Sequence, residues 1–546
     1  MDGGKLRSNC WGTRGMLLAE WLLIAATFAA AGAWPVPDVN ESHYLAKARH
    51  AVDPSWCAGD FFLESQEAHG LFFRLLGPLT AVASLPLAAW IGRWLGWLAL
   101  AVGFRHALAG VVSGMGRRLL AAALFSLALR FTTMAGEWLI GGCEAKVFAW
   151  AAVLAAWGEI AVGRWQWAWI LGGLATAWHP LVGGWMMLVT GGCFLVDRLA
   201  FRGAAPCPAM GNCWIRSVLT LALGVGLAVV GLWPALQLAA GVPLAVQQEA
   251  ARIYVVDRLP HHLLPRTFQE ALVSRHLLAI AIWWVLAGLL PASASRRRMA
   301  WVTLAALGLS LAGWIISLGE AFAPATTYGL LRYYWFRLAD GLVPLALAVA
   351  VTAVCWPDAD TRKSLEKRPW QAALAVALLI LLLVDLGNQA QHWPLPGRSI
   401  APRSDKRVAA DAWRDACDWI RRETPPTAMF LTPRGSGSFH WWAERAEVVS
   451  WKNIPQDPAG IGAWRQRVLD CFSLDGTLAS MSRSTVALGP QRLNQVAKRY
   501  GADFILAPQS SLAALPGTPP VAYHNAGYVV LPLPLPRNDT QQVTAR

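Results

Sequence analysis

Long apolar stretches recur along most of this chain and constrain its fold more than any other feature. They run from Met16 to about Leu386. Each comes close to the ~20 residues that a helix needs to cross about 30 Å of hydrocarbon. The 546 residues are 55% hydrophobic and 15% charged. Because a water-soluble core cannot bury so much apolar surface, the sequence predicts an integral membrane protein.

The apolar stretches predict about eleven membrane-spanning helices. We expect them at residues 16–33, 94–112, 119–136, 147–163, 165–178, 181–196, 217–240, 276–292, 299–317, 338–356 and 370–388. His179-Pro180 lies inside the 165–196 stretch, and proline lacks a backbone donor and restricts the residue before it. We therefore expect two short helices that meet at a turn.

The stretch 71–91 is apolar but is interrupted by Arg74, Gly77-Pro78 and Pro86. It favours an interfacial helix that leads into the second span, with a full span as the alternative. The first apolar stretch fits either a retained span or a cleaved signal peptide. Glu20 inside it, and the need for a helix behind the first loop, favour a retained span.

The cations predict the orientation, because short cytoplasmic loops are rich in Lys and Arg. Under this layout most cations, including the run Arg296 to Arg298, fall in short inner loops, and most acids fall in the outer loops. The N-terminus is then inside and the C-terminal tail outside. The net charge of +14 follows mainly from this topology, so it indicates no nucleic-acid partner.

This orientation gathers polar clusters on the outer face. They lie at Asp38 to Lys47, Glu137 to Lys146, Trp178 to Pro180, Arg258 to Pro265 and Arg332 to Asp340. Asp38 and Glu41 lie a few residues beyond the first span, where a carboxylate faces the lipid headgroups. Glu144 and Lys146 either neutralise each other at a helix start or take part in chemistry.

Histidines and arginines in the later clusters are candidate phosphate ligands. Two imidazoles and a guanidinium share the proline-flanked loop that contains Arg258, His261 and His262, and such groups bind phosphate or relay protons. His179 is either a satisfied turn residue or a ligand. Arg332 and Arg337 either snorkel to the interface or clamp a phosphate.

The arrangement resembles the GT-C class of membrane glycosyltransferases. In that class an acidic motif follows the first span, a second acid lies in the next outer loop, and a soluble domain often follows outside the membrane. Here Asn40-Glu41 with Tyr44 stands at the place of the first motif and Glu144 at the place of the second. Asn40 departs from the class, which usually has an aspartate there, and an amide cannot act as a general base.

The resemblance implies a polyprenyl-phosphate-linked sugar as donor, a glycan, lipid or protein as acceptor, and residence in a bacterial cytoplasmic membrane. Glu41 or Asp38 would act as general base, and Glu144 would assist it or, with Glu41, hold the divalent cation that some members require; no other metal or cofactor is expected. The residues expected to bind substrate or phosphate are His43, Lys146, His179, Arg258, His261, His262, Arg332 and Arg337.

A second resemblance is to a group of bacterial multi-pass proteins of this architecture. It rests on Arg258 to Pro265, Trp335 to Asp340 and Val449 to Gln456, and it implies no reaction. Two alternatives to a glycosyltransferase stay open: a transporter of a polar solute, and a non-catalytic protein that binds a lipid-linked glycan in envelope assembly. The broken helices at His179-Pro180 would suit a transporter.

The composition changes after the last span. We expect a transmembrane domain at residues 1–396, with a long outer loop at 34–93, and an extracytoplasmic α/β domain at 397–546. Within the second domain we expect helices at 408–423, 460–473 and 491–500 and strands at 428–431, 447–451, 504–507 and 528–533.

Overall fold

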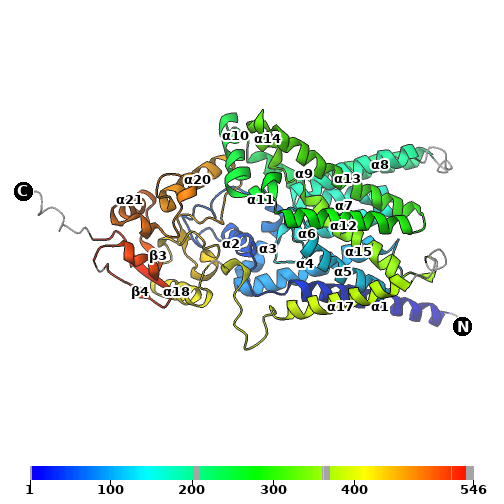
Figure 1. The fold of residues 1–546 in the computed structure, drawn as a ribbon, viewed down its shortest axis with the longest axis horizontal. Coiled ribbons are helices and arrows are strands. Elements are labelled where there is room, and N and C mark those ends of the chain that lie inside the picture. The colour runs from blue at the N-terminus through cyan, green and yellow to red at the C-terminus, as the bar shows by residue number, and fades with distance from the viewer. Residues whose placement is uncertain are drawn as a thin grey trace, which may run out of the picture.

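The computed structural model describes residues 3–200, 210–359, 361, 369–406, 408–517 and 519–536. A helical bundle forms one end of the molecule and a small α/β domain forms the other (Figure 1). Helix α1 begins at the end of the bundle that lies away from the α/β domain. The architecture is therefore a multi-pass helical bundle followed by a C-terminal α/β domain, as predicted.

Each of the predicted spans lies on a helix of the bundle. These helices are α1 (Gly3–Gly32), α4 (Leu85–Leu108), α5 (Met115–Thr132), α6 (Ala145–Ala161), α7 (Trp165–Trp178), α8 (Pro180–Ala200), α9 (Met210–Gln237), α12 (Glu270–Leu289), α13 (Ala294–Ser317), α15 (Arg337–Cys355) and α17 (Pro369–Ala390). Among the described residues, 8 helices are long and apolar enough to cross a membrane. Helices α6 and α7 are shorter, with 17 and 14 residues, and α5 carries three arginines. The number of crossings therefore stays a prediction.

The apolar stretch 71–91 divides into two helices. Helix α3 (Gly70–Val82) packs on α2 (Glu41–Val52), and α4 begins at Leu85 with Pro86 in its first turn. Proline suits that place because a first-turn N–H has no partner within the helix. The predicted interfacial helix therefore corresponds to α3 alone, and residues 85–93 of the predicted outer loop belong to the long helix α4.

Ion pairs join the bundle helices in places where an isolated charge would be costly. Glu20 of α1 accepts hydrogen bonds from Arg118 of α5 and, at 3.0 Å, from Arg105 of α4. Arg130 of α5 pairs with Asp385 of α17. Because α1 shares both this charge network and the apolar core through Ile24, Ala25 and Phe28, it is an integral part of the bundle.

Small residues allow two further helices to approach closely. A Cβ atom on Gly173 of α7 would lie 2.0 Å from the Gly224 carbonyl oxygen of α9. A side chain at either position would push the helices apart, which is the usual reason for glycine at such crossings in membranes. The turn predicted at His179-Pro180 is present, because α7 ends at Trp178 and α8 begins at Pro180.

The bundle continues through short elements into the α/β domain. Between α9 and α12 lie α10 (Leu244–Arg252), η1 (Ile253–Arg258), α11 (Pro260–Leu263) and η2 (Pro265–Thr267), and between α13 and α15 lie η3 (Leu318–Ala321) and α14 (Pro324–Leu331). The α/β domain contains η4 (Arg403–Asp405), α18 (Ala410–Glu423), α19 (Phe439–Ala443), α20 (Pro458–Phe472), η5 (Leu478–Ser480), η6 (Thr485–Leu488), α21 (Pro490–Tyr500) and η7 (Gln509–Ala514).

The strands of this domain are β1 (Met429–Leu431), β2 (Ala446–Glu447), β3 (Phe504–Pro508), β4 (Tyr523–His524) and β5 (Tyr528–Pro532). They form a mixed sheet in the order β2-β1-β3-β5-β4, in which β1 is parallel to β2 and β3, and β5 is antiparallel to β3 and β4. The predicted helices are present, as are the strands predicted at 428–431, 504–507 and 528–533, with ends that differ by one or two residues. The strand predicted at 447–451 was largely wrong, because only Glu447 of that range lies in β2. The two-residue strand β4 and the short helix α19 were not predicted.

The α/β domain packs on α2 and α3 and, at a second place, on α10 and η1. Trp441 of α19 shares a buried apolar cluster with Tyr44 of α2 and Phe72 of α3. Ile253 shares another with Trp464 of α20. The domain is therefore seated on the membrane part, and the boundary between residues 396 and 397 stays a prediction.

Candidate active site

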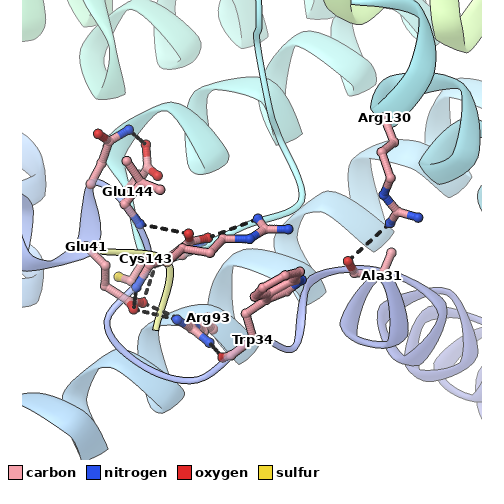
Figure 2. Close-up of polar contacts among 12 residues, drawn as sticks. Ala31, Trp34, Glu41, Arg93, Arg130, Cys143 and Glu144 are labelled. Atoms are coloured by element: carbon pink, nitrogen blue, oxygen red, sulfur yellow. Dashed lines mark hydrogen bonds and ion pairs between the residues drawn. The ribbon is translucent and has the colours of Figure 1, made fainter. Parts of the chain in front are cut away.

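The first acidic motif is fixed by an arginine of α4. Arg93 of α4 donates to both Glu41 oxygens, at 2.9 and 2.6 Å, and to the Trp34 carbonyl oxygen at 2.5 Å (Figure 2). The backbone N–H groups of Asp38 and Cys143 also donate to Glu41, at 2.9 and 2.8 Å. The Glu41 side chain has no exposed surface. Its carboxylate is thus fully engaged and joins the segment after α1 to the segment before α6.

Asp38 lies beside this pair, and its carboxylate oxygens accept fewer hydrogen bonds than those of Glu41. It accepts hydrogen bonds from the Val39 N–H at 2.7 Å and from the Gly142 N–H at 3.2 Å. The Arg403 guanidinium of η4 lies 3.8 Å from it. Arg403 also lies over the indole ring of Trp34 at 4.0 Å. A carboxylate, a cation and an aromatic face therefore meet next to the end of α1.

Asn40 connects Glu144 to the α/β domain. Its amide nitrogen donates to Glu144 at 3.1 Å, and its amide oxygen accepts from the Lys452 ammonium at 2.6 Å. Lys146 lies 3.3 Å from the same Glu144 carboxylate. The Glu144 carboxylate is therefore paired with the Lys146 ammonium of the bundle and is joined through Asn40 to the Lys452 ammonium of the α/β domain.

Burial changes the proton affinity of the groups at both ends of this connection. It raises the pKa of Glu144 above its ordinary value, although Lys146 opposes the shift. Burial, aided by the positive charge of Arg258, lowers the pKa of Lys452 to about 7. A pKa near neutrality suits Lys452 to gain or lose a proton at the working pH, and the raised pKa of Glu144 makes its carboxylate a stronger proton acceptor than an exposed glutamate.

A second ion pair extends the cluster across the bundle. The Arg337 guanidinium of α15 lies 2.9 Å from Glu137, donates to the His179 Nε2 at 3.3 Å and stacks on Tyr334 at 3.9 Å. The His179 ring lies 4.8 Å from His69, whose pKa burial lowers to about 3. Within the described residues the His69 Nδ1 is buried without a hydrogen-bond partner. Because buried polar atoms are normally hydrogen-bonded, this nitrogen is a candidate contact for a ligand.

The proline-flanked segment Arg258 to Pro265 contributes only one of its predicted ligands, Arg258, to the cluster. Arg258 donates to the Lys452 carbonyl oxygen at 3.1 Å and lies over the Trp451 ring. His262 hydrogen-bonds to the Ala135 carbonyl oxygen at 2.5 Å, whereas His261 beside it is exposed. The loop therefore places one guanidinium at the interface between the bundle and the α/β domain.

The remaining predicted ligands are His43, which lies close enough to Lys452 for its charge to act on the imidazole, and Arg332. His43 packs against Phe62, with ring centroids 4.4 Å apart, and burial lowers its pKa well below the ordinary value. Arg332 lies over the ring of the exposed Tyr333 at 5.9 Å. The predicted site residues thus share one end of the bundle. Those joined in the cluster are Asp38, Glu144, Lys146, His179, Arg258 and Arg337.

The residues do not suit a divalent cation held by Glu41 and Glu144. Both Glu41 oxygens already bind Arg93, whose positive charge would repel a dication. Across the described ranges, no group of three or more His, Cys, Asp or Glu side chains has a metal-binding arrangement.

The sequence did not identify Arg93, Arg403, His69 or Lys452 as site residues. Two signals were present in the sequence. Arg93 is an ionisable residue inside an apolar helix, which points to a partner. Lys452 lies in the Val449 to Gln456 segment, which was noted for its resemblance and not for its chemistry.

Comparisons with known proteins add little to this site. Residues 411–471 match a family described as a domain of unknown function (DUF6798). No curated protein matches the chain. A solved structure, arabinofuranosyltransferase AftD from Mycobacteria, is similar over 95% of this chain and 41% of that chain, with 15% identity and a TM-score of 0.42. The chain thus spans less than half of that protein, and we base no argument on a likeness of this level.

Proposed function

We propose that this chain is a membrane glycosyltransferase that moves a sugar from a polyprenyl-phosphate donor to an acceptor at the face where the α/β domain lies. The observation that carries the proposal is the meeting of Glu144 and Asp38 with Lys146, Arg337 and Lys452 at the end of the bundle. We expect this end of the bundle to lie at the membrane surface, where a lipid-linked donor presents its phosphate and sugar. In the orientation predicted from the cations, this is the outer face of a bacterial cytoplasmic membrane.

The reaction needs a base for the acceptor and charge for the developing sugar cation. The bond from the sugar C1 to the donor phosphate oxygen breaks, its electron pair leaves with the polyprenyl phosphate, and the acceptor oxygen bonds to C1. Glu144 takes the acceptor proton, because burial raises its pKa toward the working range. Asp38, held by the Gly142 N–H, faces the oxocarbenium-like centre.

The leaving phosphate is bound by cations from both domains. Lys146 and Arg337 come from the bundle, Arg258 from the loop after α10, and Lys452 from the α/β domain. Ammonium and guanidinium groups stabilise phosphate through charge-assisted hydrogen bonds. Asn40 does not have to act as a base in this scheme, because its amide positions Glu144 and Lys452 at the same time.

Glu41 has a positioning role in this proposal. Four hydrogen bonds and complete burial leave its carboxylate no lone pair directed at an acceptor. It holds the loop that contains Asp38 and Asn40 against the loop that contains Glu144. The general base predicted at Glu41 or Asp38 is therefore reassigned to Glu144.

Purified protein in liposomes, supplied with labelled polyprenyl-phosphate sugars extracted from bacterial membranes and with membrane acceptors, tests the proposal. We expect labelled product together with free polyprenyl phosphate. Donor that binds but stays intact would favour a non-catalytic binding protein. In a parallel assay with a labelled polar solute in place of the donor, passage of that solute unchanged across the liposome membrane would favour a transporter.

A further inference from the structure

A cavity of about 570 Å³ lies at the end of the bundle away from the α/β domain. Its walls come mainly from α12, α13 and α15. Helix α12 begins near α11, beside the α/β domain, and runs to Leu289 at the opposite end (Figure 1). The cavity surrounds this far end of α12 and the first turns of α13, so it is separate from the Asp38 and Glu144 cluster and does not rest on the proposed function.

The walls are apolar and the rim is cationic. Ala287, Ala346 and Ala350 are among the small residues of the wall, and Arg296 and Arg297 line the cavity at the start of α13. Arg296 is held in place because it donates to the Pro291 carbonyl oxygen at 2.8 Å and to Thr361 Oγ1 at 3.1 Å. The exposed Arg297 lies over the Trp301 ring at 5.9 Å.

A buried hydrogen-bond donor in the wall also indicates that the cavity binds a ligand. The Trp157 side chain of α6 lines the cavity and is 1% exposed. In the described part of the chain its Nε1 has no hydrogen-bond partner. A buried N–H without an acceptor is costly, and a ligand oxygen in the cavity would satisfy it.

We infer that this cavity binds one anionic glycerophospholipid of the surrounding membrane. An acyl chain lies between α12, α13 and α15, a lipid oxygen accepts from Trp157, and the headgroup phosphate faces Arg296 and Arg297. Basic pockets between membrane helices bind anionic headgroups in this way. A zwitterionic lipid fits less well, because its own cation would meet the two guanidinium groups.

Two variants separate lipid binding from simple snorkelling of the arginines. Arg297→Gln removes a rim charge. Gly288→Leu fills the cavity, and a side chain at Gly288 meets no atom within 4 Å of its Cβ, so the helix accepts it. Arg198→Gln is the matched control, since Arg198 is an exposed arginine of α8 outside the cavity lining.

Native mass spectrometry of the full chain, delipidated and then titrated with phosphatidylglycerol, phosphatidylcholine or polyprenyl phosphate, measures the binding. We expect one phosphatidylglycerol per chain and about tenfold weaker binding in Arg297→Gln and Gly288→Leu, with Arg198→Gln unchanged. Equal binding in all variants would overturn the inference. So would equal affinity for phosphatidylcholine, or a preference for polyprenyl phosphate over phosphatidylglycerol.

Discussion

Glu41 and Glu144 are both buried acids of the candidate site, but their surroundings differ. Glu41 is held by a bidentate arginine and two backbone N–H groups, whereas Glu144 has an amide and an ammonium group as its partners. Burial raises the pKa of Glu144, which suits a group that must accept a proton. In the proposed mechanism the two carboxylates therefore have different roles, positioning for Glu41 and proton transfer for Glu144.

Glu41→Gln should destabilise the protein. It leaves the Arg93 charge buried without its partner, and breaking such a pair costs about 3–5 kcal/mol. Thermal unfolding in detergent should show a clearly lower midpoint than for Glu144→Gln. Equal midpoints for the two variants would contradict the positioning role of Glu41.

Lys452 should make donor binding depend on pH. Burial lowers its pKa to about 7, so the side chain loses its proton as the pH rises through that value. The donor phosphodiester keeps its negative charge over this range, and donor affinity should therefore fall between pH 6 and pH 8. Donor binding measured across this range in Lys452→Arg should vary less, and Lys452→Gln should bind about tenfold more weakly at pH 6.

The sequence indicated Asp38, Glu144 and Lys146 because each lies close to the end of an apolar stretch. It did not indicate how they are joined. The Asn40 to Lys452 hydrogen bond connects residues 412 positions apart, and no local pattern predicts a contact of that range. Burial of Glu41 likewise depends on Arg93 from another helix.

At the scale of elements, α19 holds the α/β domain against the segment between α2 and α3. His440 of α19 hydrogen-bonds to Asp60 at 2.5 Å, and the Glu447 N–H of β2 donates to the same carboxylate at 2.8 Å. Burial opposes protonation of His440, but Asp60 and Glu447 outweigh it and raise its pKa to about 9. The short helix was missed in the sequence because glycine and serine residues before it favour a flexible turn.

The His440 contact should make stability fall at high pH. A histidine pKa raised from 6.5 to about 9 contributes stability that is complete below 6.5 and is lost as the pH rises through 9. The unfolding midpoint of the native chain should therefore fall from pH 6.5 to pH 9.5 more steeply than that of His440→Gln. Parallel pH profiles of the two proteins would show that the contact carries no such linkage.

Helix positions were predicted well because hydropathy and proline are local signals. The turn at Pro180 and the span on α15 follow directly from them. The division at residues 83–84 did not follow, because Pro86 fits either a break or the first turn of a helix.

At the scale of the whole molecule, the candidate site and the arginine-lined cavity lie at opposite ends of the bundle. The cation distribution predicts that the α/β domain is outside. Exposed positions near each end are Ser55, Ser510 and Ala292. In intact cells, an impermeant thiol reagent should label Ser55→Cys and Ser510→Cys, and not Ala292→Cys, relative to the chain without an added cysteine. Labelling of Ala292→Cys would reverse the orientation.

The rate of polyprenyl phosphate release by Glu144→Gln, at saturating labelled donor, tests the central claim most directly. The variant should bind donor as the native chain does, keep its unfolding midpoint within a few degrees, and turn over about 10²–10⁴-fold more slowly, which is the usual contribution of a general base. Release at the native rate would contradict Glu144 as the base and, with it, the proposed site.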